Sequence, residues 1–406
     1  MKIVVAMDSF KGCLSSREAG EAAAEGIRQI IPDAEVIVRP LADGGEGTVA
    51  ALTEDATERV TVTGPLGEPV ECEYGIIGKR GLADEPDFPL AVIECSGACG
   101  LPLVPQDRRN PMYTTTYGLG EVILDAMSKG CRRFLIGLGG SATNDGGAGM
   151  LQALGYRMTD ADGQTIENGA AGLMYLAEIR ETAAQALLAQ CTFRVACDVT
   201  NPLCGPLGCS AVFGPQKGAR AEDIPVMDEA LRRYAEKIGE FCESYSTKAA
   251  TTPSTTQRTS DPDTPGSGAA GGLGFAFRAV LGAELLPGSQ LVIQETGLED
   301  YIAGADLVIT GEGRLDAQTA MGKAPAAVAA LAHAHRVPAI ALAGSVTAEE
   351  SILRGMGLMA WYGINDRTAY DLVTAMQPET ARRNMTETAA LAVREISGRS
   401  GGRSRT

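Results

Sequence analysis

Short apolar runs alternate along the chain with glycine-rich turns and alanine-rich stretches. Residues 2–7 (KIVVAM), 132–138 (RRFLIGL), 305–311 (ADLVITG) and 338–344 (PAIALAG) are rich in aliphatic residues and show no regular polar alternation. Such runs are typical of parallel strands that are buried on both faces. Because these runs lead through turns into helical patterns, the sequence predicts an α/β fold with a doubly wound parallel sheet.

The pattern changes between Val60 and Pro105. Residues 60–78 and 89–97 alternate apolar and polar side chains and carry turn signals, which favours antiparallel strands. We therefore expect a second, mixed α/β domain at residues 65–290, inserted into a first domain made of residues 1–64 and 291–395.

Local signals mark one helix start and two poorly ordered segments. Ser15 and Glu18 have the spacing of a capping box, which predicts that a helix begins there. Residues 243–264 are rich in Ser, Thr and Pro and predict a mobile loop, and the basic, low-complexity residues 396–406 predict a disordered tail.

Charge and composition narrow the class of partner. The 406 residues are 45% hydrophobic and carry a net charge of −16, which disfavours nucleic acid and acidic membranes as partners. No apolar run is long enough for a membrane span, and the first apolar run is too short for a signal peptide. The ten cysteines form no C-x-x-C pair and only two histidines occur, so we expect free thiols, no zinc site and a cytoplasmic location.

Glycine-rich turns that follow strands are the main functional signal, and we predict them at residues 8–12, 43–48, 137–149, 266–274 and 311–316. They bring backbone N–H groups close to a ligand, which suits phosphate. The densest is FLIGLGGSATNDGGAG at residues 134–149, where Gly137, Gly139 and Ala142 fit the dinucleotide fingerprint G-x-G-x-x-A. That fingerprint is weak here, since no acidic strand end follows it, and the chain has no P-loop. We predict a phosphate cradle, against the alternative of a loop that is glycine-rich only for tight packing.

Charged residues in or near these turns supply the candidate chemistry. Phosphoryl transfer needs carboxylates to hold Mg²⁺ and one to orient or deprotonate the attacking hydroxyl. We assign a catalytic role to Asp198, Lys11 and Arg314, with Asp198 as the base. The predicted metal ligands are Asp8, Asp43, Asp145 and Asp316. The alternative for each carboxylate is a helix cap or turn, and for each cation a solvated side chain.

The remaining site residues are predicted to bind substrate or phosphate through backbone N–H groups, hydroxyls, an amide and one ammonium. They are Ser9, Gly44, Gly45, Gly139, Gly140, Ser141, Thr143, Asn144, Lys217, Gly271, Gly272, Gly311 and Gly313.

Seven motifs, taken in order, resemble the bacterial glycerate kinase family of the two-domain, type-1 kind. They are MDSFKG, LADGGEGT, GLGGSATNDGG, DVTNPL, GPQKGA, PGSGAAGGLGFA and GEGRLDAQT. The resemblance runs from Met1 to about residue 363 and implies ATP-dependent, Mg²⁺-dependent phosphorylation of D-glycerate, with 2-phosphoglycerate favoured over 3-phosphoglycerate. It also implies a Rossmann- or flavodoxin-like domain that carries an inserted α/β domain.

Two other readings compete with a kinase. One is a nicotinamide-dependent oxidoreductase of a small hydroxy acid, although the paired histidines of LAHAHR (331–336) fit a proton relay poorly. The other is a non-catalytic protein that binds an organic acid. A pure anion sensor would gain nothing from carboxylates in its glycine-rich turns, which favours the kinase.

Overall fold

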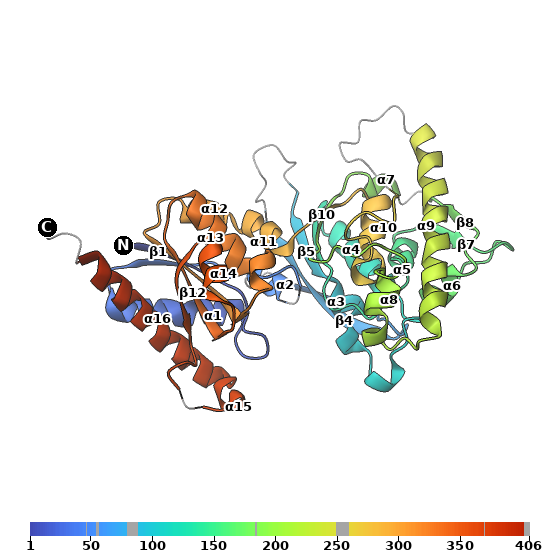
Figure 1. Cartoon of the computed structure of the whole chain (residues 1–406). Coiled ribbons are helices and arrows are strands. Elements are labelled where there is room, and N and C mark those ends of the chain that lie inside the picture. Colours follow the sequence, from blue (N-terminus) through green and yellow to red (C-terminus); the bar gives the residue numbers. More distant parts are fainter. Residues whose placement is uncertain are drawn as a thin grey trace. The chain divides into compact units, whose positions relative to one another are not determined.

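The computed structural model describes residues 1–45, 47–53, 57–78, 88–182, 185–248, 260–368 and 370–401. It divides into two compact units (Figure 1). The first unit combines Met1–Asp43 with Ser289–Thr406, and the second is Gly44–Gly288. The second unit therefore begins 21 residues earlier than the predicted boundary at 64/65. The reason is that β3 (Thr57–Thr63) pairs with β4 (Pro69–Ile77) in the sheet of the second unit.

The first unit is built on a five-stranded sheet in the order β13-β12-β11-β1-β2, in which every pair of neighbours is parallel. Its strands are β1 (Lys2–Met7), β2 (Glu35–Val38), β11 (Leu307–Leu315), β12 (Ala339–Val346) and β13 (Leu358–Gly363). Because β1 lies between β2 and β11, the N-terminal segment occupies an interior position and is wholly buried along Ile3–Met7.

Helices cover both faces of this sheet, so the doubly wound prediction is confirmed. On one face α1 (Ser16–Ile30) and α16 (Pro378–Gly401) pack against each other and against the side chains of Ile3 and Val5. On the other face α13 (Ala324–Ala334) packs on β11 and β12. The unit also contains α11 (Gly288–Thr296), α12 (Leu298–Ile302), α14 (Glu350–Gly355), α15 (Leu372–Ala375) and the 3₁₀ turn η5 (Thr319–Met321).

The predicted capping box is present at the start of α1. The Ser15 Oγ accepts a hydrogen bond from the Glu18 backbone N–H at 3.2 Å, and the Glu18 Oε2 accepts one from the Ser15 backbone N–H at 2.8 Å. The pair satisfies two donors that the first turn of a helix would otherwise leave unbonded.

The second unit is built on a six-stranded mixed sheet in the order β10-β9-β6-β5-β4-β3. Strands β3, β4 and β5 are antiparallel to their neighbours in this run, as the alternating pattern predicted, whereas β5, β6, β9 and β10 are parallel. The remaining bounds are β5 (Leu90–Glu94), β6 (Arg133–Gly137), β9 (Thr192–Ala196) and β10 (Glu284–Leu286), with a separate hairpin of β7 (Arg157–Thr159) and β8 (Glu178–Arg180).

Helices pack around this sheet and enclose an aromatic core. The rings of Phe134 and Phe193 stack at 4.9 Å, and Phe277 packs on Phe193. The helices are α2 (Thr48–Thr53), α3 (Cys95–Cys99), α4 (Tyr117–Ser128), α5 (Ala148–Ala153), α6 (Gly169–Leu173), α7 (Gln185–Leu188), α8 (Cys209–Phe213), α9 (Asp223–Lys248) and α10 (Leu273–Ala279). Short 3₁₀ turns lie at η1 (Leu101–Leu103), η2 (Gln106–Arg108), η3 (Pro215–Lys217) and η4 (Ala269–Gly271).

Both segments predicted to be irregular begin as helix. Residues 243–248 complete α9, and residues 396–401 complete α16, because the helical pattern before each segment carries on into it. Residues 249–259 and 402–406 lie outside the described residues. All ten cysteines are free thiols. Within the described ranges, no helix combines the length and apolar character that a membrane span requires.

Candidate active site

Three carboxylates gather at the carboxyl ends of β1 and β11 in the first unit. Asp8 directly follows β1, is 6% exposed, and donates its backbone N–H to the Gly311 carbonyl at 2.9 Å. Asp43 follows β2 and forms an ion pair with Lys11 at 3.3 Å. Glu312 lies on β11 and accepts a hydrogen bond from the Thr319 hydroxyl at 2.5 Å. We call Asp8, Asp43 and Glu312 the carboxylate cluster.

Burial and like charge act together on this cluster. Burial, and secondarily the Asp43 carboxylate, raise the pKa of Asp8 to about 7, although Lys11 and the Ser9 backbone N–H oppose the shift. Burial also raises the pKa of Glu312. A cation bound here would relieve the repulsion between the carboxylates.

The cluster is suited to a cation that brings other ligands with it. In the described part of the chain, no three or more His, Cys, Asp or Glu side chains are arranged to hold a metal ion alone. Mg²⁺ is commonly bound through one or two carboxylates together with phosphate oxygens and water. Asp8 and Asp43 fit that second kind of site.

The segment predicted as a turn at residues 311–316 is largely strand. β11 continues to Leu315, and Arg314 pairs in register with Ser345 of β12. Gly311 fits a close contact between strands, because a Cβ there would meet the Leu342 carbonyl and the Met7 sulfur. Glycine therefore serves packing at this position, and the turn prediction is wrong.

The polar residues near this strand take different positions. Arg314 is exposed, Gly313 and Ser9 are half-buried, and the Ser9 N–H donates to Asp8 Oδ1 at 2.6 Å. Asp316 shapes the following turn, since its Oδ1 accepts from the Gln318 N–H at 2.9 Å.

A glycine-rich loop of residues 138–147 joins β6 to α5 in the second unit, and we call it the glycine loop. Its backbone carbonyls between residues 139 and 143 point to internal donors. The Gly139 carbonyl accepts from the Cys95 thiol at 3.3 Å, the Gly140 carbonyl from the Leu101 N–H at 2.8 Å, and the Ala142 carbonyl from the Thr114 hydroxyl at 2.9 Å. The loop is therefore fixed from inside the unit.

The outer end of this loop leaves donors unbonded. Gly140 is exposed with φ +70°, and no other described residue accepts a hydrogen bond from the N–H of Gly139 or Gly140. Backbone N–H groups with no protein partner are donors that an anion can use. This part of the loop has the chemistry of the predicted phosphate cradle.

The inner end of the loop is packed rather than open. Thr143, Asn144 and Asp145 are wholly buried. Asp145 Oδ2 accepts from the Thr116 N–H at 2.9 Å and from the Thr116 hydroxyl at 2.8 Å, and Gly147 and Gly149 donate their N–H groups to the same carboxylate. Burial raises the pKa of Asp145 while these donors lower it. The structure thus gives the predicted metal ligand Asp145 four internal donors.

Three further predicted residues also contact the loop from inside. Gly271 and Gly272 are buried with φ of +70° and +96°, and a Cβ on either would collide with the backbone of Thr143 or of Gly146. Lys217, predicted as a phosphate contact, is 3% exposed and donates to Ser141 Oγ at 2.8 Å and to the Thr143 carbonyl at 2.7 Å.

Other predicted residues lie at the carboxyl edge of the same sheet. Asp198 follows β9, is exposed, and accepts the Gly288 N–H at 2.9 Å. Gly44 has φ +84° and lies against Ala196 and the Cα of Gly288, and the Gly45 carbonyl accepts from the Thr48 hydroxyl at 2.8 Å. Because β5, β6 and β9 are parallel, their carboxyl ends share one edge, where α/β sheets bind ligands.

Two acidic residues were absent from the predicted site. Glu312 belongs to the carboxylate cluster, and its place directly after the predicted strand at residues 305–311 was the available signal. Glu94 ends β5 and accepts the N–H groups of Gly47 at 3.1 Å and Val49 at 2.9 Å. No spacing in the sequence reveals that contact, because it joins residues 45 or more positions apart.

Similarity to known proteins extends over both units. The profile of the Glycerate kinase family matches residues 3–397. A protein named Glycerate 2-kinase from Escherichia coli (strain K12) is 42% identical over 406 residues, covering 97% of this chain and 99% of that protein. A protein named Glycerate kinase from Bacillus subtilis (strain 168) is 44% identical over 367 residues, 90% of each chain. A crystal structure assigned as glycerate kinase 2 from Salmonella typhimurium LT2 matches with a TM-score of 0.86 and 42% identity over 99% of each chain.

Proposed function

The chain belongs to the glycerate kinase family, and we propose that it transfers the γ-phosphoryl group of ATP to the 2-hydroxyl of D-glycerate. The glycine loop carries this proposal, because its carbonyls are bonded inward while the N–H groups of Gly139 and Gly140 are left to receive an anion. The E. coli relative's name, Glycerate 2-kinase, supports 2-phosphoglycerate as the product. Family membership favours a kinase over an oxidoreductase or a binding protein.

In the second unit we assign the proton and the anion contacts. Asp198 is an exposed carboxylate at the carboxyl end of β9, so it can accept the proton of the attacking hydroxyl. Gly139, Gly140 and Ser141 are assigned to oxygens of a phosphoryl group or of the substrate carboxylate. Transfer then needs positioning and charge stabilisation more than covalent chemistry by the protein.

In the first unit we assign the metal and the polyphosphate contacts. Asp8 and Asp43 would hold Mg²⁺, which when bound neutralises phosphate charge. Positive charge for the polyphosphate would come from Lys11 and Arg314. The Lys11 side chain is 68% exposed, and Arg314 is exposed as well. ATP as phosphoryl donor and ten free thiols both support a cytoplasmic location.

The test is ADP release by the purified protein with ATP, Mg²⁺ and D-glycerate. We expect release that chelation of the metal abolishes, and a phosphorus NMR spectrum of 2-phosphoglycerate. Glycerol is the matched control, because it offers the hydroxyls without the carboxylate. Absence of ADP release with glycerate would contradict the kinase, whereas a 3-phosphoglycerate spectrum would contradict only the choice of hydroxyl.

A further inference from the structure

We propose that Lys217 is a positioning residue for the reaction: its buried ammonium fixes the glycine loop so that the N–H groups of Gly139 and Gly140 are held ready for the anion. Lys217 does not contact the substrate in this scheme. The inference rests on the proposed function, since it names what keeps the anion site in shape.

The contacts of Lys217 define its role. The side chain is 3% exposed, and Nζ donates to Ser141 Oγ at 2.8 Å and to the Thr143 carbonyl at 2.7 Å. These acceptors lie on either side of Ala142, so one cation holds two points of the loop. The Ala142 carbonyl between them accepts from Thr114. Movement of this stretch would therefore break several hydrogen bonds at once.

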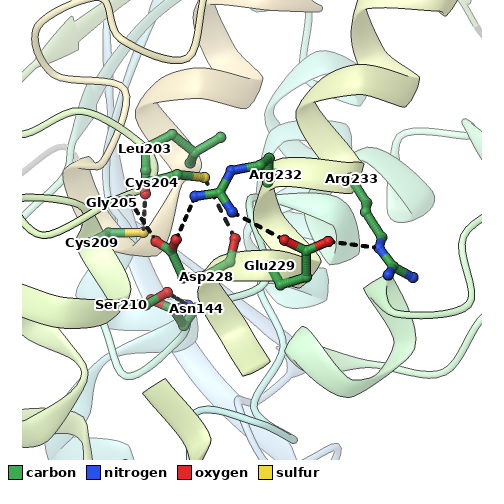
Figure 2. Close-up of polar contacts among 10 residues, drawn as sticks. All are labelled: Asn144, Leu203, Cys204, Gly205, Cys209, Ser210, Asp228, Glu229, Arg232 and Arg233. Atoms are coloured by element: carbon green, nitrogen blue, oxygen red, sulfur yellow. Dashed lines mark hydrogen bonds and ion pairs between the residues drawn. The ribbon is translucent and has the colours of Figure 1, made fainter. Parts of the chain in front are cut away.

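The loop is held by a segment that is itself anchored. Figure 2 shows the buried amide of Asn144 donating to Ser210 Oγ at 2.8 Å, at the start of α8. The segment before α8 is tied to α9, because Asp228 Oδ1 accepts the Gly205 N–H at 2.7 Å. Ser210 and Lys217 therefore reach the loop from one continuous stretch of chain that α9 stabilises.

Among the described residues, no carboxylate forms an ion pair with the buried ammonium of Lys217. Burial lowers the pKa of Lys217, with Asp145 and the thiols of Cys95, Cys99 and Cys209 as the ionisable groups around it. A buried cation without an ion-pair partner costs stability. Replacing it by methionine removes that cost but leaves Ser141 Oγ and the Thr143 carbonyl unbonded, so the two effects on stability oppose each other.

The experiment compares Lys217→Met with Lys129→Met. Lys129 is the control: its ammonium makes three hydrogen bonds, to Glu58, Tyr74 and Asp125, against two for Lys217, but it lies before β6 rather than after it. For Lys217→Met we expect kcat to fall about 100-fold, the effect of a small misplacement of a reacting group. The melting temperature should stay within about 4 °C of wild type. For Lys129→Met we expect kcat near wild type.

Hydrogen exchange without any substrate is the second readout. Lys217→Met should speed amide exchange in residues 138–144, and Lys129→Met should not. Because this measurement needs no turnover, it stands apart from the proposed function, which fails only if the wild type releases no ADP. Unchanged exchange in Lys217→Met, together with a raised KM for ATP, would overturn the positioning role in favour of direct phosphate contact.

Ser141→Ala keeps the inference testable if Lys217→Met does not fold. This variant leaves the buried cation in place and removes one of its two acceptors, so exchange in residues 138–144 should rise by a smaller factor. If both variants fold, their effects on the exchange rates of residues 138–144 should be less than additive in the double variant, since both break the contact between Lys217 and Ser141. Additive effects would overturn the inference.

Discussion

The carboxylate cluster of the first unit and the glycine loop of the second lie at equivalent places, the carboxyl ends of parallel strands, but use different chemistry. The first gathers side-chain charge, and Asp8 is so crowded by burial and Asp43 that its pKa rises to about 7. The second has no exposed carboxylate of its own and presents backbone N–H groups whose carbonyl sides are bonded inward.

This difference teaches how each region would respond to damage. A site made of like charges is unfavourable until a cation arrives, so losing a charge should harm binding more than folding. A site made of backbone depends on the packing behind it, so substitutions that contact no ligand should harm it.

The largest expected effect is on the carboxylate cluster. Asp8→Asn should lower kcat/KM by about 10²- to 10⁴-fold and raise the Mg²⁺ concentration needed for activity, since a metal ligand is lost. Asp198→Asn is the contrast, because a lost base should lower kcat at every Mg²⁺ concentration. Full activity of Asp8→Asn at the wild-type Mg²⁺ requirement would remove Asp8 from the metal site.

Asp8→Asn should raise the stability of the fold although it lowers activity. The folded pKa of Asp8 lies above its ordinary value of 3.8, so ionising Asp8 reduces the free energy of unfolding progressively from about pH 4 to about pH 7. Asparagine cannot ionise, so the variant should gain stability relative to wild type across this range. Melting temperatures at pH 5 and pH 8 would show it, and a variant less stable than wild type at both would contradict the crowding of charge.

The next largest effect is expected from a substitution that disrupts the packing behind the glycine loop. Gly271→Ala should cost about 3 kcal/mol of unfolding free energy, because it adds a backbone collision to an unfavourable positive φ. Gly205→Ala is the matched control: its φ is +89° but no atom lies within 4 Å of the added Cβ. It should cost only about 1–2 kcal/mol. Equal losses in urea unfolding would show that backbone conformation alone, and not packing on Thr143, requires glycine at residue 271.

The smallest expected effect is on the capping box of α1, which lies outside both the carboxylate cluster and the glycine loop. Ser15→Ala removes the capping box of α1 and should lower the free energy of unfolding by about 1 kcal/mol. Its kcat and KM should match wild type, because among the described residues the Ser15 hydroxyl forms hydrogen bonds with Glu18 alone. A large kinetic change in this variant would mean that the start of α1 takes part in the site.

Local sequence patterns were sufficient to predict the strands and one helix start, but not the role of each glycine. The buried strands, the antiparallel pairing of β3 and β4 and the capping box at Ser15 follow from short-range patterns, and the structure confirms them. At Gly311 the same reasoning failed, because a glycine inside a strand and one in a turn look alike until the neighbouring strand is known. Glycine is required there by the close approach of β12, which lies about 30 residues away in the chain.

The sequence predicted the site from residue types in glycine-rich segments, and the structure shows which of those residues are buried. Asp198 and Gly140 are exposed and Gly139 is half-buried, and their assignment to a ligand stays a prediction. Lys217 and Asp145, by contrast, are buried and bonded to the loop itself. A lysine among glycines has the same sequence signature whether it faces solvent or the interior. The distinction depends on contacts such as the one between residues 217 and 141, which no local pattern encodes.

The interleaving of the two units has a consequence for biosynthesis. Ile3 of β1 pairs with Leu307 of β11, and α1 packs on α16, so the first unit is assembled from two segments that are translated before and after the second unit. On the ribosome, the apolar strand β1 and the buried face of α1 must wait for some 300 residues before their partners emerge, whereas the second unit is complete once residue 288 has been made. Nascent chains with apolar segments waiting in this way are prone to aggregate. The first unit is therefore where trigger-type chaperones and translation speed would have most influence on the yield of folded protein.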